Sequence, residues 1–146
     1  MALPGYRLPF TSDLFPKYVW ALLTIYFLAN LAHFTNNAEY IAFYPNMPTW
    51  ITRETVYLAW LAITSVGLAG IALSHLGLPF LGAVSLAAYG AFGLDGLAHY
   101  TLALCSEHTL AMNLTIWAEA SAGLVLALYC AVFASRLLAA RAVRAN

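Results

Sequence analysis

Residues 90–123 read GAFGLDGLAHYTLALCSEHTLAMNLTIWAEASAG and predict a hairpin of two membrane-spanning helices. An apolar run carries Asp95 and His99, breaks at a short polar turn, and resumes with Glu119 inside the next apolar run. An ionisable side chain at membrane depth costs about 2.5 to 3.5 kcal/mol on insertion scales, so it normally faces a bundle interior and has a function. If Asp95 and His99 share an α-helix, their four-residue separation places them about 40° apart around its axis. We therefore expect both to face the same neighbour.

The composition is that of a membrane protein rather than of a soluble domain. Of the 146 residues, 63% are hydrophobic and 8% are charged, against roughly 45 to 50% and about 25% in ordinary globular chains. So few charges cannot cover a water-exposed surface. The formal net charge is zero and Lys and Arg cluster only in the C-terminal tail, which argues against nucleic acid as a partner. The partner that the composition predicts is the lipid bilayer.

Four apolar segments, separated by turn residues, predict four spans within one domain that comprises residues 1–146. The spans are expected at about residues 14–34, 53–75, 79–104 and 109–138. Helical structure is expected to continue past the first span to Tyr44, where two prolines follow. Thr52 is the expected cap of the second helix, and Ser106 or Thr109 that of the fourth. The predicted fold class is all-α, a transmembrane four-helix bundle with antiparallel neighbours.

The basic residues predict the orientation of this bundle. Most of them flank the two ends of the chain, which lie on the same side of four spans, and these are Arg7, Lys17, Arg136, Arg141 and Arg144. Arg53 lies in a connection on the opposite side. The positive-inside rule then places both termini in the cytoplasm. Residues 1–17 contain three prolines and lack the apolar core of a cleavable signal peptide, so the first span is expected to act as its own insertion signal. We expect a multi-pass protein of a cellular membrane, with a bacterial inner membrane as the first candidate.

The topology predicts a polar site in the outer half of the membrane. His33 lies near the outer end of the first span, Asp95 and His99 lie in the third, and Glu119 lies in the fourth. A four-helix bundle can bring such side chains together around its axis. Thr115 precedes Glu119 by one turn and is expected to hydrogen-bond to it. The ligand-binding residues expected beside His33 are Asn30, Asn37, Tyr100, Thr115 and Trp117.

Two kinds of chemistry fit these residues. Ionisable groups in apolar surroundings can exchange protons near neutral pH, so Asp95, His99 and Glu119 are candidate catalytic residues acting on an apolar or lipid-like ligand. Imidazole and carboxylate groups also suit transition metals, so His33, Asp95, His99 and Glu119 are candidate ligands of a zinc or iron ion. The paired Glu-x-x-His motifs of di-iron bundles are absent from the sequence.

A structural alternative stays open beside these functions. The polar groups can satisfy one another as interhelical pairs, such as Asp95 with His99 or His33 with Glu119. The protein is then a non-catalytic accessory or scaffolding subunit, with a membrane-protein partner or a second copy of itself. His108 is expected to be a solvated turn residue.

Small residues and cysteines add two further expectations. Gly90, Gly93 and Gly96 recur every three residues and predict a stripe that a neighbouring helix can approach closely. Cys105 and Cys130 are expected at different depths, which argues against a disulfide between them. The predicted architecture, four spans with acidic residues at membrane depth, resembles that of the sterol-isomerase and sigma-2-receptor superfamily. No family motif aligns with this sequence, so no residue role follows from the resemblance.

Overall fold

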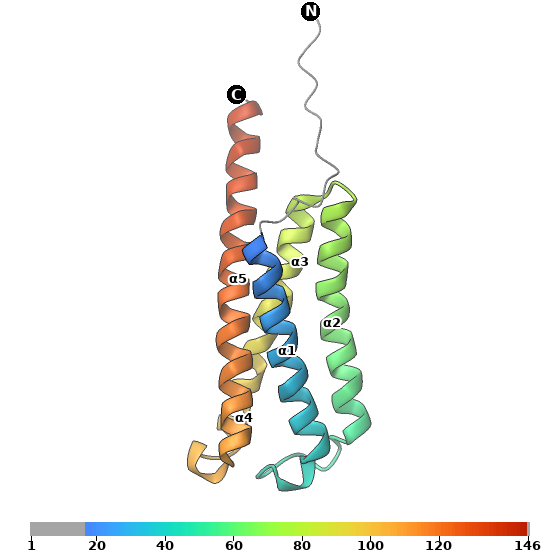
Figure 1. Cartoon of the computed structure of the whole chain (residues 1–146), viewed down its shortest axis with the longest axis vertical. Helices are drawn as coiled ribbons and strands as arrows, with labels where there is room; N and C mark the ends of the chain where they lie inside the picture. The colour runs from blue at the N-terminus through green and yellow to red at the C-terminus, as the bar shows by residue number, and fades with distance from the viewer. Residues whose placement is uncertain (1–16, 146) are drawn as a thin grey trace, which may run out of the picture.

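The computed structural model describes residues 17–145, and these are entirely helical apart from short connections (Figure 1). The α-helices are α1 (Lys17–Glu39), α2 (Arg53–His75), α3 (Pro79–Ala91), α4 (His99–Leu102) and α5 (Leu110–Ala145). Three 3-10 segments join or extend them, namely η1 (Ile41–Phe43), η2 (Phe92–Ala98) and η3 (Cys105–Glu107). The predicted all-α fold class is confirmed for this part of the chain.

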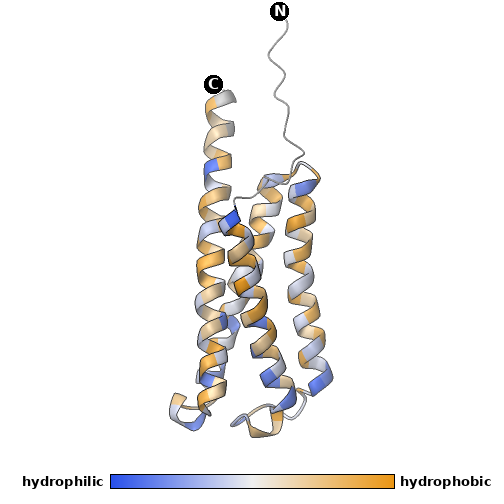
Figure 2. Cartoon of the chain, viewed as in Figure 1, coloured by the Kyte–Doolittle hydropathy of each residue, from blue (hydrophilic) through white to orange (hydrophobic). Residues whose placement is uncertain are grey.

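Four segments among the described residues are long and apolar enough to cross a membrane. They are Lys17–Glu39, Arg53–His75, Pro79–Leu102 and Leu110–Ala140. The second matches the predicted span, and the others differ from the predicted ranges by a few residues at their ends. Residues 14–16 of the predicted first span lie outside the described residues. Figure 2 shows hydrophobic residues along the lengths of the helices, as a bilayer-facing surface requires.

The predicted helix ends agree with the observed caps. The Thr52 hydroxyl accepts a hydrogen bond from the Thr55 backbone N–H at 3.3 Å, so Thr52 caps α2. The Thr109 hydroxyl accepts from the Met112 N–H at 3.2 Å, so Thr109 rather than Ser106 caps α5. After α1, helical structure continues through η1 and ends before Pro45, as predicted.

The helices run antiparallel in chain order and form one bundle (Figure 1). The start of α1 and the end of α5 lie at one end, which we term the terminal end. The connections 40–52 and 103–109 form the opposite end, which we term the distal end. α5 packs against α1, α3 and η2, and α2 packs against α1 and α3.

The interior changes character along the bundle axis. In the terminal half it is an apolar core of Val19, Leu23, Tyr26, Leu86, Tyr89, Leu126 and Cys130. In the distal half the buried side chains include Asn30, His33, Asn37 and Glu119. Cys105 is exposed and Cys130 is buried, and both thiols are free, as predicted.

The predicted glycine stripe forms a close contact between the third and fourth spans. A Cβ atom at Gly90 would lie 2.6 Å from the Gly123 carbonyl oxygen, and one at Gly93 would lie 2.9 Å from the Glu119 carbonyl oxygen. Neither position has room for a side chain, because backbone lies directly opposite. The stripe therefore brings α3 and η2 against the α5 backbone at the level of Glu119.

The third span is not a continuous α-helix, which corrects one prediction. Residues Phe92–Ala98 wind as the 3-10 helix η2, and with three residues per turn a four-residue separation is about 120° rather than 40°. Asp95 is accordingly exposed, whereas His99 is half-buried. The two side chains therefore differ in exposure and do not share the face that a continuous α-helix would give them. The same winding keeps Gly93, Gly96 and His99, each three residues apart, on one side of the span.

Candidate functional site

The distal half of the bundle contains a group of polar side chains that we term the distal cluster. All but His99 are buried, and His99 is half-buried. They come from α1, α4, α5 and both distal connections, so segments far apart in the sequence meet here. The members are Asn30, His33, Asn37, Tyr44, His99, His108 and Glu119.

Glu119 is anchored to α1. Asn30, His33 and Asn37 are three and four residues apart and therefore share one face of α1. The Asn30 amide donates to Glu119 Oε1 at 2.5 Å, and His33 Nε2 lies 3.5 Å from Glu119 Oε2. The predicted pairing of His33 with Glu119 is therefore confirmed. Thr115 does not have the role predicted for it, because its hydroxyl donates to the Met112 carbonyl oxygen at 3.0 Å.

Asn37 connects the two histidines of the cluster. Its amide nitrogen lies 3.0 Å from His33 Nε2 and 3.2 Å from His99 Nε2. The amide donates to both imidazoles as placed, and it would accept from both if its nitrogen and oxygen were exchanged. In either case Glu119, His33, Asn37 and His99 form one continuous chain of polar contacts. This chain leads from a fully buried carboxylate to a half-buried imidazole.

Tyr44 and His108 cover the distal side of His99. Their rings lie 4.8 Å and 6.2 Å from the His99 ring, measured between centroids. The Tyr44 hydroxyl donates to Asn36 Oδ1 at 2.7 Å. Burial raises the pKa of the Tyr44 hydroxyl above its ordinary value, so it stays a neutral donor.

His108 has a defined tautomer. Its Nδ1 lies 2.9 Å from the Leu104 carbonyl oxygen and must donate to it, which leaves the Nε2 lone pair free. His108 is 7% exposed, so the prediction that it is solvated is wrong. The turn directs this side chain into the bundle, and helical periodicity contains no information on where a turn residue points.

Several polar atoms of the distal cluster lack a hydrogen-bond partner among the described residues. They are Asn30 Oδ1, His33 Nδ1, Asn37 Oδ1, His108 Nε2 and Glu119 Oε2. Each buried polar atom without a partner costs about 1 to 3 kcal/mol. Their concentration at one place indicates hydrogen-bonding capacity that the neighbouring side chains do not use.

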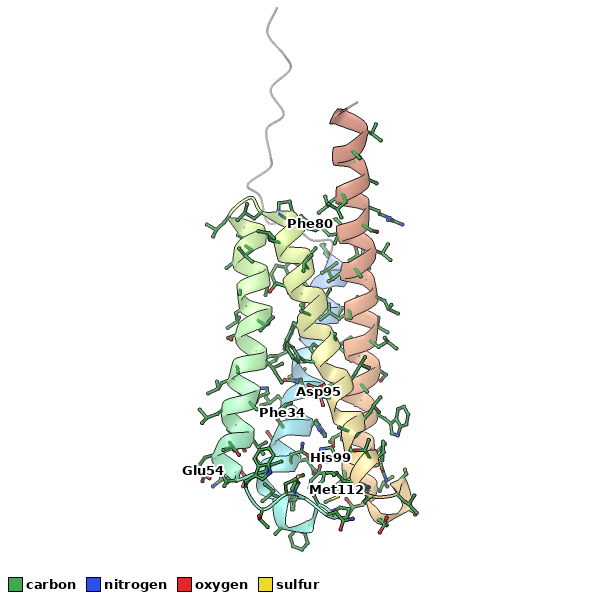
Figure 3. All side chains as sticks on the ribbon, turned by 180° about the vertical axis from the view of Figure 1, so that it is seen from behind. Phe34, Glu54, Phe80, Asp95, His99 and Met112 are labelled. Carbon is green, nitrogen blue, oxygen red and sulfur yellow. The ribbon has the colours of Figure 1, made fainter. Side chains whose placement is uncertain are left out.

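The other predicted site residues lie outside the distal cluster. Asp95 is exposed, and Figure 3 shows it nearer the middle of the bundle than His99 and Met112. Trp117 is 56% exposed on the outer surface. The Tyr100 hydroxyl donates to Asn113 Oδ1 at 2.7 Å, within the distal connection rather than in the cluster.

The geometry gives no support to the predicted zinc or iron site. Across residues 17–145, no three His, Cys, Asp or Glu side chains are placed so that they could hold a metal ion. Of the proposed ligands, Asp95 is exposed whereas His33 and Glu119 are buried. The Nε2 atoms of His33 and His99 both contact Asn37 instead.

Comparisons with protein-family models, with curated proteins and with solved structures find no match for this chain. The fold and composition are those of a multi-pass α-helical membrane protein with a buried polar cluster near one end. Any function must therefore be argued from the cluster itself.

Proposed function

We propose that this protein binds a lipid-like molecule by its polar head group in the distal cluster and exchanges a proton with it. The observation that carries the proposal is the set of five buried polar atoms without partners in an otherwise apolar bundle. Interhelical packing alone does not account for them, because groups that only fix packing satisfy one another. A bound polar group would satisfy them.

The free atoms define the chemistry of the head group. Asn30 donates through its nitrogen to Glu119, so its free Oδ1 is an acceptor. Glu119 Oε2 and His108 Nε2 are acceptors as well. His33 Nδ1 carries the hydrogen of the neutral ring when Nε2 accepts from Asn37, so it is a free donor, and the free acceptors outnumber it. Such a cluster fits a head group that donates, which is a hydroxyl or an amine. An anionic head group such as a carboxylate does not fit.

Each residue of the chain then has a role in proton exchange. Glu119 accepts the proton of a bound ammonium group through Oε2, whereas a bound hydroxyl group donates a hydrogen bond to Oε2 and keeps its proton. His33, with Nε2 3.5 Å from that oxygen, is the next acceptor. Asn37 keeps His99 beside His33, and the half-buried His99 releases the proton toward the distal surface. The nitrogen of the amine keeps the electron pair of the broken N–H bond.

The test uses the full-length protein in lipid nanodiscs. Infrared difference spectra record the carbonyl band of protonated carboxyl groups while 1-dodecanol, dodecylamine or dodecanoate is added. We expect the alcohol or the amine, but not dodecanoate, to change the band in the parent protein. E119Q should abolish the change, whereas E107Q in the exposed turn should retain it. Equal responses to all three probes, or an unchanged response in E119Q, would contradict the proposal.

Asp95 favours a second candidate function, that of an accessory subunit. It is an exposed carboxylate within the span Pro79–Leu102, and no ion pair to it exists among the described residues. Exposure of a carboxylate to lipid is costly, and a polar group on a neighbouring membrane protein would offset that cost. We propose Asp95 as the contact to such a partner or to a second copy. D95N should then change the oligomeric state in mild detergent and leave head-group binding intact.

A further inference from the structure

A cavity separate from the distal cluster lies between α1, α2 and α3. Its volume is about 200 Å³. Trp20 and Phe27 of α1 precede Asn30 along the helix, so the cavity lies toward the terminal end from the cluster. Its wall includes Trp20, Phe27, Thr64, Gly67, Ile71 and Tyr89.

Two hydroxyl groups of this apolar wall have no partner beyond each other. Thr64 Oγ1 and the Tyr89 hydroxyl are both buried and close enough to interact, and neither has another hydrogen-bond partner among the described residues. If one of the two turned to donate to the other, the hydrogen of the second would still be free. A hydrocarbon in the cavity would leave that donor unsatisfied, at a cost of about 1 to 3 kcal/mol. An acceptor oxygen would satisfy it.

Tyr89 is held rigidly in this position, and it is 3% exposed. A Cβ atom at Gly67 would lie 2.7 Å from Cδ1 of the Tyr89 ring, so the ring rests directly on the α2 backbone. The Tyr26 ring packs edge-on against it at 4.6 Å, and the Tyr26 hydroxyl donates to the Tyr89 carbonyl oxygen at 2.8 Å. The Tyr89 hydroxyl is therefore a fixed donor at the cavity wall.

We propose that this cavity binds a membrane-dissolved ketone about the size of one substituted ring. An apolar cavity of about 150 Å³ holds benzene, so the larger volume here accepts a ring with substituents. Trp20 and Phe27 contribute aromatic walls. A carbonyl oxygen has two lone pairs and accepts from both Thr64 and Tyr89. The cavity thus offers donors, in contrast to the acceptors of the distal cluster, and takes a different ligand.

Three probes with one carbon skeleton test the proposal, namely menthone, menthol and p-menthane. Their binding to the full-length protein in nanodiscs is measured by gas chromatography against empty nanodiscs of the same lipid. We expect saturable binding of menthone, weaker binding of menthol, and only lipid partitioning of p-menthane. T64V and Y89F should each weaken menthone binding about threefold to tenfold, the effect of losing one hydrogen bond. T64S retains a hydroxyl and should bind menthone like the parent.

The controls separate this site from the distal cluster. Thermal unfolding establishes that each variant is folded, and E119Q should leave menthone binding unchanged. Loss of menthone binding in E119Q with retention in Y89F would place the ketone in the distal cluster and overturn the proposal. Equal saturable binding of p-menthane and menthone, or no saturable binding of any probe, would overturn it as well.

Discussion

At the level of single residues, substitution of Gly93 and of Gly96 should have different effects on stability, although both glycines belong to the same stripe. A Cβ atom at Gly96 would lie 3.1 Å from Glu119 Oε2 and 3.4 Å from His33 Nε2, which are side-chain atoms that can shift. A Cβ atom at Gly93 would lie 2.9 Å from the Glu119 carbonyl oxygen, which cannot. We expect G93A to lower the free energy of unfolding by about 1 to 3 kcal/mol, and G96A to change it by less than about 1 kcal/mol.

For the infrared response of Glu119 we expect the reverse order, with a larger effect of G96A than of G93A. G96A moves the carboxylate and imidazole of the proposed proton chain, so it should alter the infrared response of Glu119 while the bundle stays folded. Chemical unfolding in detergent measures the free energy of unfolding, and infrared difference spectroscopy measures the response of Glu119. Equal destabilisation by both substitutions would mean that the close contacts at Gly93 relax.

The bond between Asn30 and Glu119 makes a second residue-scale prediction. Both side chains are buried, so Asn30→Leu leaves Glu119 Oε1 without its donor. We expect this variant to lose about 1 to 3 kcal/mol of unfolding free energy. The further change Glu119→Met removes the orphaned carboxylate, and the double variant should recover part of the loss. Additive effects of the two substitutions in a double-mutant cycle would show that the pair is not coupled.

At the level of elements, the sequence predicts the spans well and the winding of the third span poorly. Apolar runs bounded by Pro and Gly determine where the helices lie, and these are visible in the sequence. The 3-10 segment Phe92–Ala98 packs against α5, and the apolar periodicity of the sequence does not predict its winding. The three-residue spacing of the glycines was an indication, because only a three-residue turn keeps Gly93, Gly96 and His99 on one face.

Asp95 makes a prediction about insertion of the third span. Its carboxylate lies within the apolar segment and therefore contributes to the cost of inserting it. Asp95→Leu should make insertion of the segment Pro79–Leu102 more favourable by about 2 to 3 kcal/mol. A glycosylation-based insertion assay on the isolated segment measures this quantity. An unchanged insertion free energy would show that the carboxylate reaches water.

The connection before α5 makes a further prediction. The Asn113 amide nitrogen donates to the Cys105 carbonyl oxygen at 3.0 Å and to that of His108 at 3.3 Å. Asn113→Ala removes both bonds and should release His108 from the distal cluster. His108 should then react faster with diethyl pyrocarbonate, with the exposed His75 as an internal reference. An unchanged rate at His108 would mean that its bond to Leu104 alone holds the ring.

At the level of the whole molecule, the two proposed sites lie in different parts of the interior and have opposite hydrogen-bonding needs. The cavity near Tyr89 offers donors, and the distal cluster around Glu119 offers acceptors. The sequence located part of the cluster, since His33, His99 and Glu119 are ionisable residues in apolar runs. It did not reveal His108, Tyr44 or the cavity, because these depend on how the turns fold back and how α1, α2 and α3 are spaced. Such positions are set by tertiary packing rather than by residue periodicity.

The distribution of charge determines how the whole bundle is oriented in the membrane. Lys17, Arg136, Arg141 and Arg144 belong to the parts of α1 and α5 at the terminal end. Arg53 at the distal end is paired with Glu39 at 2.7 Å. From the positive-inside rule we predict that the terminal end lies in the cytoplasm and the distal end outside.

Reporter fusions test this orientation in cells. A fluorescent reporter at the C-terminus should be active in the cytoplasm, and a phosphatase inserted in the connection 45–50 should be active outside. The orientation also decides which compartment the proposed proton chain faces, since His99 is its half-buried member. In oriented proteoliposomes the infrared band of Glu119 should then follow the pH on the distal side and not the pH on the terminal side. If the reporters show the reverse orientation and the Glu119 band still follows the pH on the distal side, the cluster communicates with the cytoplasm instead.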